Sequence, residues 1–259
     1  MTSSINNRLR ESLQGLGSFG LLTWEVMASL FSRKTVTRDV VYQFYYLGVK
    51  SQAVVLITGA FTGMVLCAQA YFQFHKVRME TGTLALVSVS LLSELGPVLT
   101  GLMVAGRVGA SLAAELGTMR VTEQIDALRT LATHPVDYLI VPRFLATTLA
   151  LPLLTAAAIV VGIGAAYGLA VFYLDIDPTY VWERMLLYTN NGHVLTGLIK
   201  AMVFGAMIGL ISCYKGITCG EGAEGVGRAT TEAVVYSSIS ILISNFFLTL
   251  FLDRVLSPR

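Results

Sequence analysis

Five long apolar segments restrict what this chain can fold into more than any other feature of its sequence. Each is long enough to cross about 30 Å of hydrocarbon as a helix of about 20 residues. None of them contains more than one charged residue. The predicted spans are Ser51 to Phe74, Thr81 to Gly106, Phe144 to Leu174, about Gly192 to Tyr214, and Ala233 to Leu252.

The composition supports this interpretation. Only 13% of the 259 residues are charged, against about 25% in an average soluble domain. We therefore expect an all-α integral membrane protein. The third span is longer than a bilayer needs and contains Pro152, so it should tilt, kink or extend beyond the membrane. A net charge of +2 is too small to indicate nucleic acid as a partner.

The region before the spans has a different character. Apolar residues recur at helical spacing between Ile5 and Phe31, and four charged residues interrupt them. This pattern favours a helix lying in the headgroup plane. A cytosolic helix packed on the rest of the chain is the alternative. The predicted division is residues 1–47 as an N-terminal interfacial or cytoplasmic helical region, and residues 48–259 as a five-helix transmembrane domain.

The distribution of lysine and arginine among the connections predicts the orientation of the chain in the membrane. One set of connections carries twelve of these residues and the other carries five. Because basic residues concentrate on the cytoplasmic side, the N-terminus and the connection between the second and third spans should be cytoplasmic. An odd number of spans then places the C-terminus on the opposite side.

Three spans contain the Gly-x-x-x-Gly pattern, which lets helix backbones approach closely. The pairs are Gly59/Gly63, Gly164/Gly168 and Gly205/Gly209. They are compatible with a tightly packed bundle or with a dimer.

Motifs for covalent chemistry are absent from the sequence. There is no Gly-x-x-x-x-Gly-Lys-Ser/Thr loop for phosphate, and the three histidines form no metal-binding cluster. The segment "GEGAEG" at Gly220–Gly225 matches a dinucleotide pattern only formally, because it follows a membrane helix rather than a strand. We therefore expect neither enzymatic activity nor a cofactor or metal in this chain.

Two charged residues lie inside the spans. Glu94 is near the middle of the second span, one turn before Pro97, and Lys200 is in the fourth. A charge at that depth costs about 2.5–3.5 kcal/mol on insertion scales, so it usually has a partner or faces a cavity. One possibility is that Glu94 and Lys200 pair and stabilise each other. The other is that Glu94 is a polar point in a substrate cavity.

The connection between the second and third spans is unusually ordered for a loop. Gly106 and Gly109 flank Arg107 where the span should leave the membrane, and the polar stretch "AELGTMRVTEQIDAL" (Ala114–Leu128) follows. Thr122 could cap a helix carrying Glu123 and Asp126 in its positive first turn. Ile125 and Leu128 would give this helix an apolar edge. The segment, about residues 108–137, thus predicts a short cytoplasmic helix suited to docking, or an ordinary amphipathic loop helix.

Four motifs in order resemble the MlaE/YrbE family of permeases. They are "ELGPV" (Glu94–Val98), "AGRVGASLAAELGTM" (Ala105–Met119), "TEQIDAL" (Thr122–Leu128) and "HPVDYLIVPR" (His134–Arg143). Members of this family are the membrane subunits of ABC lipid transporters associated with MCE-domain proteins. The resemblance covers most of the chain after about residue 40.

The resemblance implies partners and a location that the residue pattern does not show. It implies a homodimer in the bacterial inner membrane, with phospholipid held between the two copies. A cytosolic ABC ATPase subunit would bind ATP and Mg²⁺ and grip the connection between the second and third spans. A periplasmic ring of MCE-domain protein would exchange lipid, and a small STAS-domain protein often accompanies the ATPase.

The resemblance also suggests site residues. The expected ATPase-coupling residues are Glu115, Arg120, Glu123 and Asp126. The expected lipid-cavity residues are Leu66, Gln69, Gln73, Phe74, Glu94 and Leu95. Some relatives carry a basic residue before the "ELGP" glutamate, where this chain has Ser93.

The sequence therefore predicts a permease that moves phospholipid between the inner membrane and a periplasmic MCE-domain protein, and so maintains outer-membrane lipid asymmetry. The alternative is an autonomous ion- or proton-coupled carrier that uses Glu94 and Lys200. A structural scaffold fits less well, because a scaffold has no need of charges within its spans.

Overall fold

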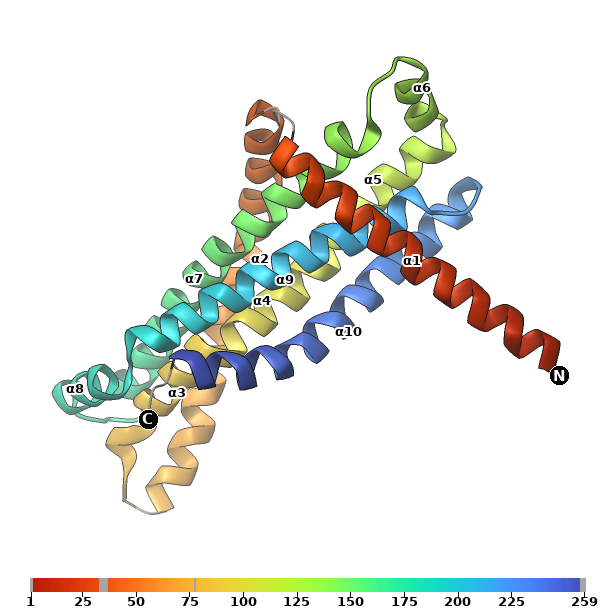
Figure 1. Cartoon of the computed structure of the whole chain (residues 1–259). Helices are drawn as coiled ribbons and strands as arrows, with labels where there is room; N and C mark the ends of the chain where they lie inside the picture. The colour runs from red at the N-terminus through yellow and green to blue at the C-terminus, as the bar shows by residue number, and fades with distance from the viewer. Residues whose placement is uncertain (1, 33–36, 77, 257–259) are drawn as a thin grey trace.

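The computed structural model describes residues 2–32, 37–76 and 78–256, and it is built of helices (Figure 1). Five helical stretches are long and apolar enough to cross a membrane, which confirms the predicted spans. They cover Arg38–Lys76, Thr83–Val121, Val136–Phe172, Asn191–Ile217 and Gly222–Val255. Each extends beyond its apolar segment at one end or both, because polar residues continue the helix past the hydrocarbon layer.

The helices have the following bounds. The α-helices are α1 (Thr2–Ser32), α2 (Thr37–Lys76), α3 (Thr83–Ser90), α4 (Gly96–Val104), α5 (Ala110–Val121), α6 (Gln124–Thr130), α7 (Val141–Phe172), α8 (Pro178–Tyr188), α9 (Asn191–Ile217) and α10 (Gly222–Leu256). Short segments are the 3₁₀ turn η1 (Glu80–Gly82) and the π-helical turns η2 (Leu91–Leu95), η3 (Ala105–Gly109) and η4 (Val136–Ile140).

The helix of the second span does not end at Gly106, where the span was predicted to leave the membrane. Helix α4 passes through η3 directly into α5, and the helical rod continues to Val121. The glycines flanking Arg107 form a widened π-helical turn instead of an exit loop. The first predicted docking residue, Glu115, is therefore part of the extended second span.

Close glycine contacts hold α2 and α9 against α7. A side chain on Gly59 or Gly63 would collide with the backbone of Ala158 or Gly162. Gly205 and Gly209 meet the backbone and side chain of Thr147 and its neighbours in the same way. The Gly164/Gly168 pair has open space around it, so it makes no such contact within the chain. Two of the three patterns thus pack the bundle.

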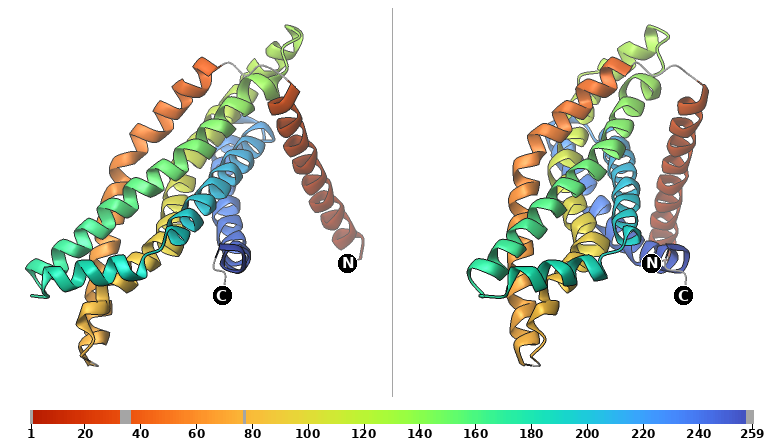
Figure 2. Two further views of the ribbon diagram at one scale, coloured as in Figure 1. Left: turned by 60° about the vertical axis from the view of Figure 1, so that its left-hand side comes forward. Right: turned by 90° about the vertical axis from the view of Figure 1, so that its left-hand side faces the viewer.

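The two ends of the bundle are distinct (Figure 2). Helix α6 lies at one end, together with the ends of α1 and α9, and α8 and η1 lie at the other. Figure 1 shows α1 running away from the bundle, so the predicted N-terminal helix exists. Because α2 is unbroken from Thr37 to Lys76, the predicted division between residues 47 and 48 falls inside this helix. Arg33, Lys34 and Arg259, counted for the orientation, lie outside the described residues.

Candidate functional site

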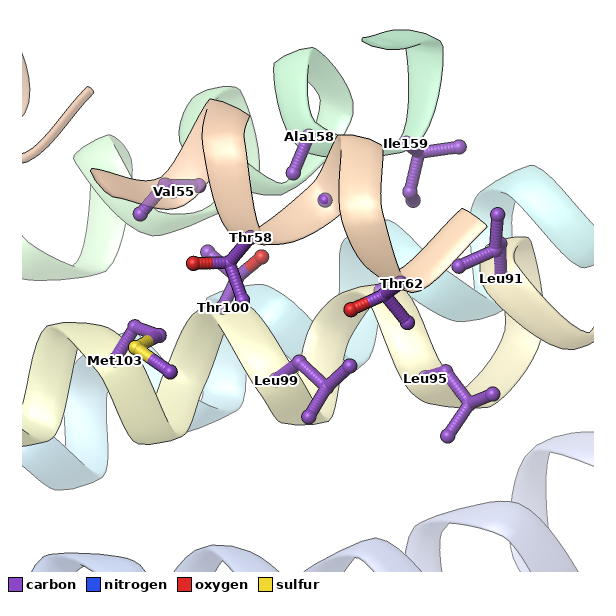
Figure 3. A pocket seen from close by; sticks show the side chains of 12 residues that line it. Val55, Thr58, Thr62, Leu91, Leu95, Leu99, Thr100, Met103, Ala158 and Ile159 are labelled. Atoms are coloured by element: carbon purple, nitrogen blue, oxygen red, sulfur yellow. The ribbon is translucent and has the colours of Figure 1, made fainter. Parts of the chain in front are cut away.

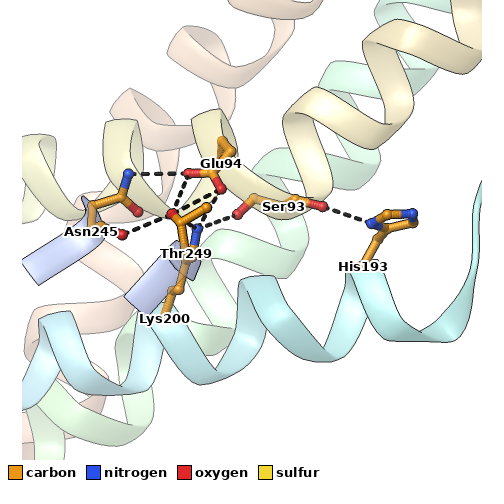
Figure 4. A network of polar contacts seen from close by, with 6 residues as sticks. All are labelled: Ser93, Glu94, His193, Lys200, Asn245 and Thr249. Atoms are coloured by element: carbon orange, nitrogen blue, oxygen red, sulfur yellow. Dashed lines mark hydrogen bonds and ion pairs between the residues drawn. The ribbon is translucent and has the colours of Figure 1, made fainter. Parts of the chain in front are cut away.

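Glu94 and Lys200 form an ion pair inside the membrane-spanning bundle (Figure 4). The Nζ atom of Lys200 lies 2.7 Å from Oε1 of Glu94. The lysine side chain is fully buried, whereas 36% of the glutamate side chain is exposed. The predicted pairing is therefore confirmed. Burial of the ammonium group makes its partners obligatory, because an unpaired charge in this environment is very costly.

The backbone of the second span supplies another partner for Lys200. In a regular α-helix the N–H of residue 97 would bind the carbonyl of residue 93, but proline has no N–H to donate. The Ser93 carbonyl is thereby free, and Lys200 donates to it at 3.0 Å. Gly96 donates to Leu91 rather than to Leu92, which makes the turn π-helical. The "SELGP" segment thus creates a polar notch for the lysine.

Helices α9 and α10 complete this network. Thr249 accepts from Lys200 at 2.8 Å and donates to Glu94 at 3.0 Å. The Asn245 side chain donates to the other carboxylate oxygen at 3.1 Å. On the far side of the turn, the Ser93 hydroxyl lies 3.0 Å from Nδ1 of His193. The network therefore joins the second, fourth and fifth spans at one level.

Four of the six predicted cavity residues line one groove. Leu66, Gln69, Gln73 and Phe74 of α2 face the Leu86–Ser90 part of α3 across an open cavity of about 610 Å³. Its walls are mainly apolar, and the two glutamine side chains add polar groups on one side. This arrangement suits a molecule with acyl chains and a polar end.

Glu94 and Leu95 do not line that groove. Leu95 lies with Leu91 and Leu99 along a seam between the second span, α2 and α7 (Figure 3). The seam leaves only about 10 Å³ of space, room for about one water molecule. The structure thus divides the six residues among a groove, a packed seam and the ion-pair network.

Helix α6 is short and carries its charges outward. Ile125 is buried and Leu128 is partly buried against a cluster that includes Val26 of α1 and Ile140. The predicted apolar edge exists, but this chain covers it itself. The surface available to a partner is the charged outer face, where Asp126 pairs with Arg129 at 3.0 Å.

The start of α6 differs from the prediction. Thr122 is not an N-cap: it ends α5, and its hydroxyl donates to the carbonyl of Thr118. Glu123 occupies the N-cap position in a left-handed conformation with φ of 59°, and its side chain makes no capping hydrogen bond. Asp126 does lie in the first turn, as predicted.

Glu115 and Arg120 have partners within the chain. The Glu115 carboxylate lies 3.3 Å from the guanidinium of Arg143, a buried residue at the base of α7. Arg120 donates to the carbonyl of Ile217 at the end of α9, where a cation complements the helix dipole. Both residues therefore brace α5 against its neighbours, and Glu123 and Asp126 remain the outward-facing acids.

Several residues that take part in these contacts were not predicted from the sequence. Asn245 and Thr249 are neutral polar residues one turn apart in an uncharged span, a pattern that could have indicated a shared partner. His193 and Arg143 gave no such signal, because their partners are about 100 and 28 residues away in sequence. Among the described residues, no group of three His, Cys, Asp or Glu could hold a metal ion.

Comparison with known proteins decides the family. The family model described as Permease MlaE matches residues 40–251. The chain belongs to the MlaE permease family. A "Probable ABC transporter permease protein" of Rickettsia felis is 44% identical over 249 residues, which cover 96% of each chain. The chain is thus a membrane permease rather than an enzyme.

Two further MlaE relatives carry more informative names. The "Intermembrane phospholipid transport system permease protein MlaE" of Haemophilus influenzae is 34% identical over 95% of each chain. "Protein TRIGALACTOSYLDIACYLGLYCEROL 1, chloroplastic" of Arabidopsis thaliana is 37% identical over 90% of this chain and 67% of that protein. The recognition of an MlaE-type permease from the sequence is confirmed.

Proposed function

We propose that this MlaE permease moves phospholipid between the inner membrane and a periplasmic MCE-domain protein, and so maintains outer-membrane lipid asymmetry. The groove between α2 and α3 carries the proposal, because it combines apolar walls with Gln69 and Gln73. The name of the Haemophilus relative supports a phospholipid as the substrate. The groove lies at the end of the bundle that carries η1 and α8, which is the periplasmic end in our orientation.

The orientation has the N-terminus and α6 in the cytoplasm and the C-terminus in the periplasm. Basic residues support it, because most of the connections that carry them gather at the α6 end of the bundle. The odd number of spans supports a periplasmic C-terminus once α2 begins on the cytoplasmic side.

A homodimer completes the transporter in this proposal. Helix α10 presents a long apolar face to its surroundings, and this face suits a second copy of the chain. Its exposed members include Ile239, Leu242, Ile243, Phe246, Phe247 and Leu250. Glu94 lies beneath α10 and is partly exposed, so the ion-pair network would lie near the contact between the copies.

A separate cytosolic ABC ATPase drives this permease in the proposal and holds the ATP and Mg²⁺. The outward acids of the α5–α6 junction, Glu123 and Asp126, would contact it, while Glu115 and Arg120 transmit the movement to α7 and α9. A small STAS-domain protein on the ATPase would complete the assembly.

Reversing the charge of Glu123 or Asp126 tests the proposed coupling between the permease and its ATPase. In the complex purified with its ATPase, Glu123→Lys and Asp126→Lys should reduce lipid-stimulated ATP hydrolysis by at least tenfold while leaving the permease folded. The control is Glu183→Lys, an exposed acid of α8 at the opposite end of the bundle. Normal ATP turnover and lipid transfer in both α6-end variants would refute the docking assignment.

Filling the groove tests the substrate site. Ser90→Trp should narrow the groove and reduce both co-purified phospholipid, measured by mass spectrometry, and transfer to an MCE acceptor. Leu153→Trp, at an exposed position of α7, is the matched control. Unchanged lipid content and transfer in the Ser90 variant would exclude the groove as the lipid site.

The carrier alternative loses support in the structure. Lys200 is fully buried and has three partners, so it has little freedom to bind and release an ion. Purification under mild conditions separates the alternatives: an autonomous carrier comes out alone, whereas the permease brings an ATPase with it.

A further inference from the structure

Helix α8 (Pro178–Tyr188) is an amphipathic element between two membrane spans, and the sequence analysis gave it no role. It begins after Asp177, whose side chain accepts the N–H of Thr179 at 2.8 Å and so caps the first turn. Only residues 173–177 separate it from α7, and residues 189–190 from α9. Figure 2 shows α8 lying across the end of the bundle between those two helices. Its distance from the membrane boundary is therefore limited by the reach of a few residues.

One face of α8 packs on the protein. Val181 and Met185 are buried one turn apart in a cluster with Leu84 and Val87 of α3. Val87 also lines the groove between α2 and α3. The position of α8 is thus tied to one wall of that groove.

A second flank of α8 turns back toward the membrane interior. The ring of Trp182 meets the ring of Tyr167 edge to face, with 6.0 Å between centroids. Tyr167 lies five residues before the end of α7, which places it about 7.5 Å inside that helix end. The Trp182 side chain nevertheless remains 49% exposed, and Leu186, one turn further on, is exposed on the same flank.

The remaining surface of α8 is more polar. Arg184 lies about 160° around the helix from Trp182, and Glu183 lies about 100° from each of them. Both charged residues are exposed and share this surface with Tyr180 and Leu187. An apolar flank toward the membrane and a charged flank away from it is the pattern of helices that lie in the headgroup layer. Tryptophan and tyrosine are enriched at that layer.

We propose that α8 is an interfacial anchor. It lies in the headgroup layer of the leaflet at the end of the bundle opposite α6, with Trp182 and Leu186 inserted into the lipid surface. Through Val181 and Met185 the anchor also fixes the position of the α3 wall of the groove relative to the headgroup layer. This inference does not depend on the proposed lipid transport.

The chain offers a direct test, because it contains only two tryptophans, Trp24 and Trp182. Trp24 is exposed on α1, so Trp24→Phe leaves Trp182 as the single fluorophore without disturbing the core. The full-length variant is reconstituted in phosphatidylcholine vesicles brominated either near the headgroup end or near the methyl end of the acyl chain. The matched control carries Trp24→Phe, Trp182→Phe and Arg184→Trp, which moves the fluorophore to the charged flank.

An interfacial anchor predicts that headgroup-proximal bromine quenches Trp182 at least roughly twofold more than deep bromine. It also predicts that aqueous acrylamide quenches Trp182 less than it quenches the control. Stronger quenching by deep bromine would overturn the proposal, as would equal access of acrylamide to both fluorophores. Protection from bromine and acrylamide together would overturn it as well, because a protein or a second copy of the chain would then cover the flank.

Discussion

The ion pair between Glu94 and Lys200 should show an unequal response to neutralisation. Glu94→Gln removes the counter-charge of a fully buried ammonium group and leaves it only neutral acceptors, namely the Ser93 carbonyl, Thr249 and the new amide oxygen. Removing the counterion of a buried charge typically costs about 3–5 kcal/mol of stability. Lys200→Met leaves a carboxylate that is 36% exposed and still accepts from Thr249 and Asn245. Solvent reduces that penalty, so we expect about 2–3 kcal/mol.

The double variant separates pairing from independent contributions. With both charges removed, the main remaining defect is the Ser93 carbonyl, which loses the donor that replaced the missing proline N–H. Its loss should cost about 1–3 kcal/mol. The two single costs sum to about 5–8 kcal/mol and should exceed the cost of the double variant, so the interaction energy should be at least about 2 kcal/mol in magnitude. The charge swap Glu94→Lys with Lys200→Glu should restore only part of the stability, because a glutamate at position 200 cannot donate to Ser93.

Unfolding of the reconstituted protein by increasing sodium dodecyl sulfate, followed by circular dichroism, measures these differences. Lys76→Met, at an exposed site ending α2, is the control and should change stability by less than about 0.5 kcal/mol. Additive single costs would show that the two charges act separately. A larger loss for Lys200→Met than for Glu94→Gln would refute the reasoning from unequal burial.

Three further perturbations follow from the geometry and use the same unfolding assay. Gly63→Ala places a methyl group against the α7 backbone and should lower stability by about 1–3 kcal/mol. The control Gly164→Ala, in open space, should be nearly neutral. Equal effects of the two variants would contradict the close packing of α2. The Glu123→Gly variant should be about 1 kcal/mol more stable than the Glu123→Ala variant, because glycine adopts the left-handed φ of 59° without strain. Equal stability of the two variants would argue against that conformation. Pro97→Ala restores an N–H that can bind the Ser93 carbonyl, so it should reduce the cost of Lys200→Met; an unchanged cost would show that this carbonyl contributes little.

The five spans could be predicted from the sequence because length and hydropathy determine them. The helix ends could not, because the helices continue into polar sequence that hydropathy does not register. Helix α10 begins at Gly222, well before the apolar segment that starts at Ala233. The same effect carried the second span past Gly106, where a glycine pair was interpreted as an exit. Glycine permits a turn but does not require one when the neighbouring residues favour helix.

The ion pair between Glu94 and Lys200 could be predicted from the sequence, whereas the groups that surround it could be predicted only in part. Two opposite charges in apolar spans are expected to pair, since an unpaired charge at that depth is very costly. The proline four residues after Ser93 also marks which carbonyl is free. The contribution of α10 could not be read, because nothing in a single sequence shows which face of one helix meets another.

The α5–α6 segment illustrates a different limit. Its charge pattern correctly predicted a short helix with an apolar edge, but not that α1 would help to cover that edge. Whether an amphipathic edge meets a partner or the same chain depends on tertiary packing. The left-handed Glu123 was equally hidden, since glutamate has no preference for that conformation.

The second span links the charged junction at α6 to the ion pair through one continuous helical rod. From Thr83 to Val121 it is interrupted only by η2 and η3, each of which widens the turn without breaking the helix. Such π-helical turns are frequent at functional sites, and they weaken the hydrogen-bond ladder locally. In the proposed transporter, force applied at α6 would pass along α5 to η3 and then along α4 to η2. Lys200 holds η2 from α9 through both Glu94 and Ser93, so the resistance of that turn to bending depends directly on the ion pair. A defect at Glu94 should therefore weaken coupling to ATP hydrolysis as well as stability, although it lies far from the ATPase.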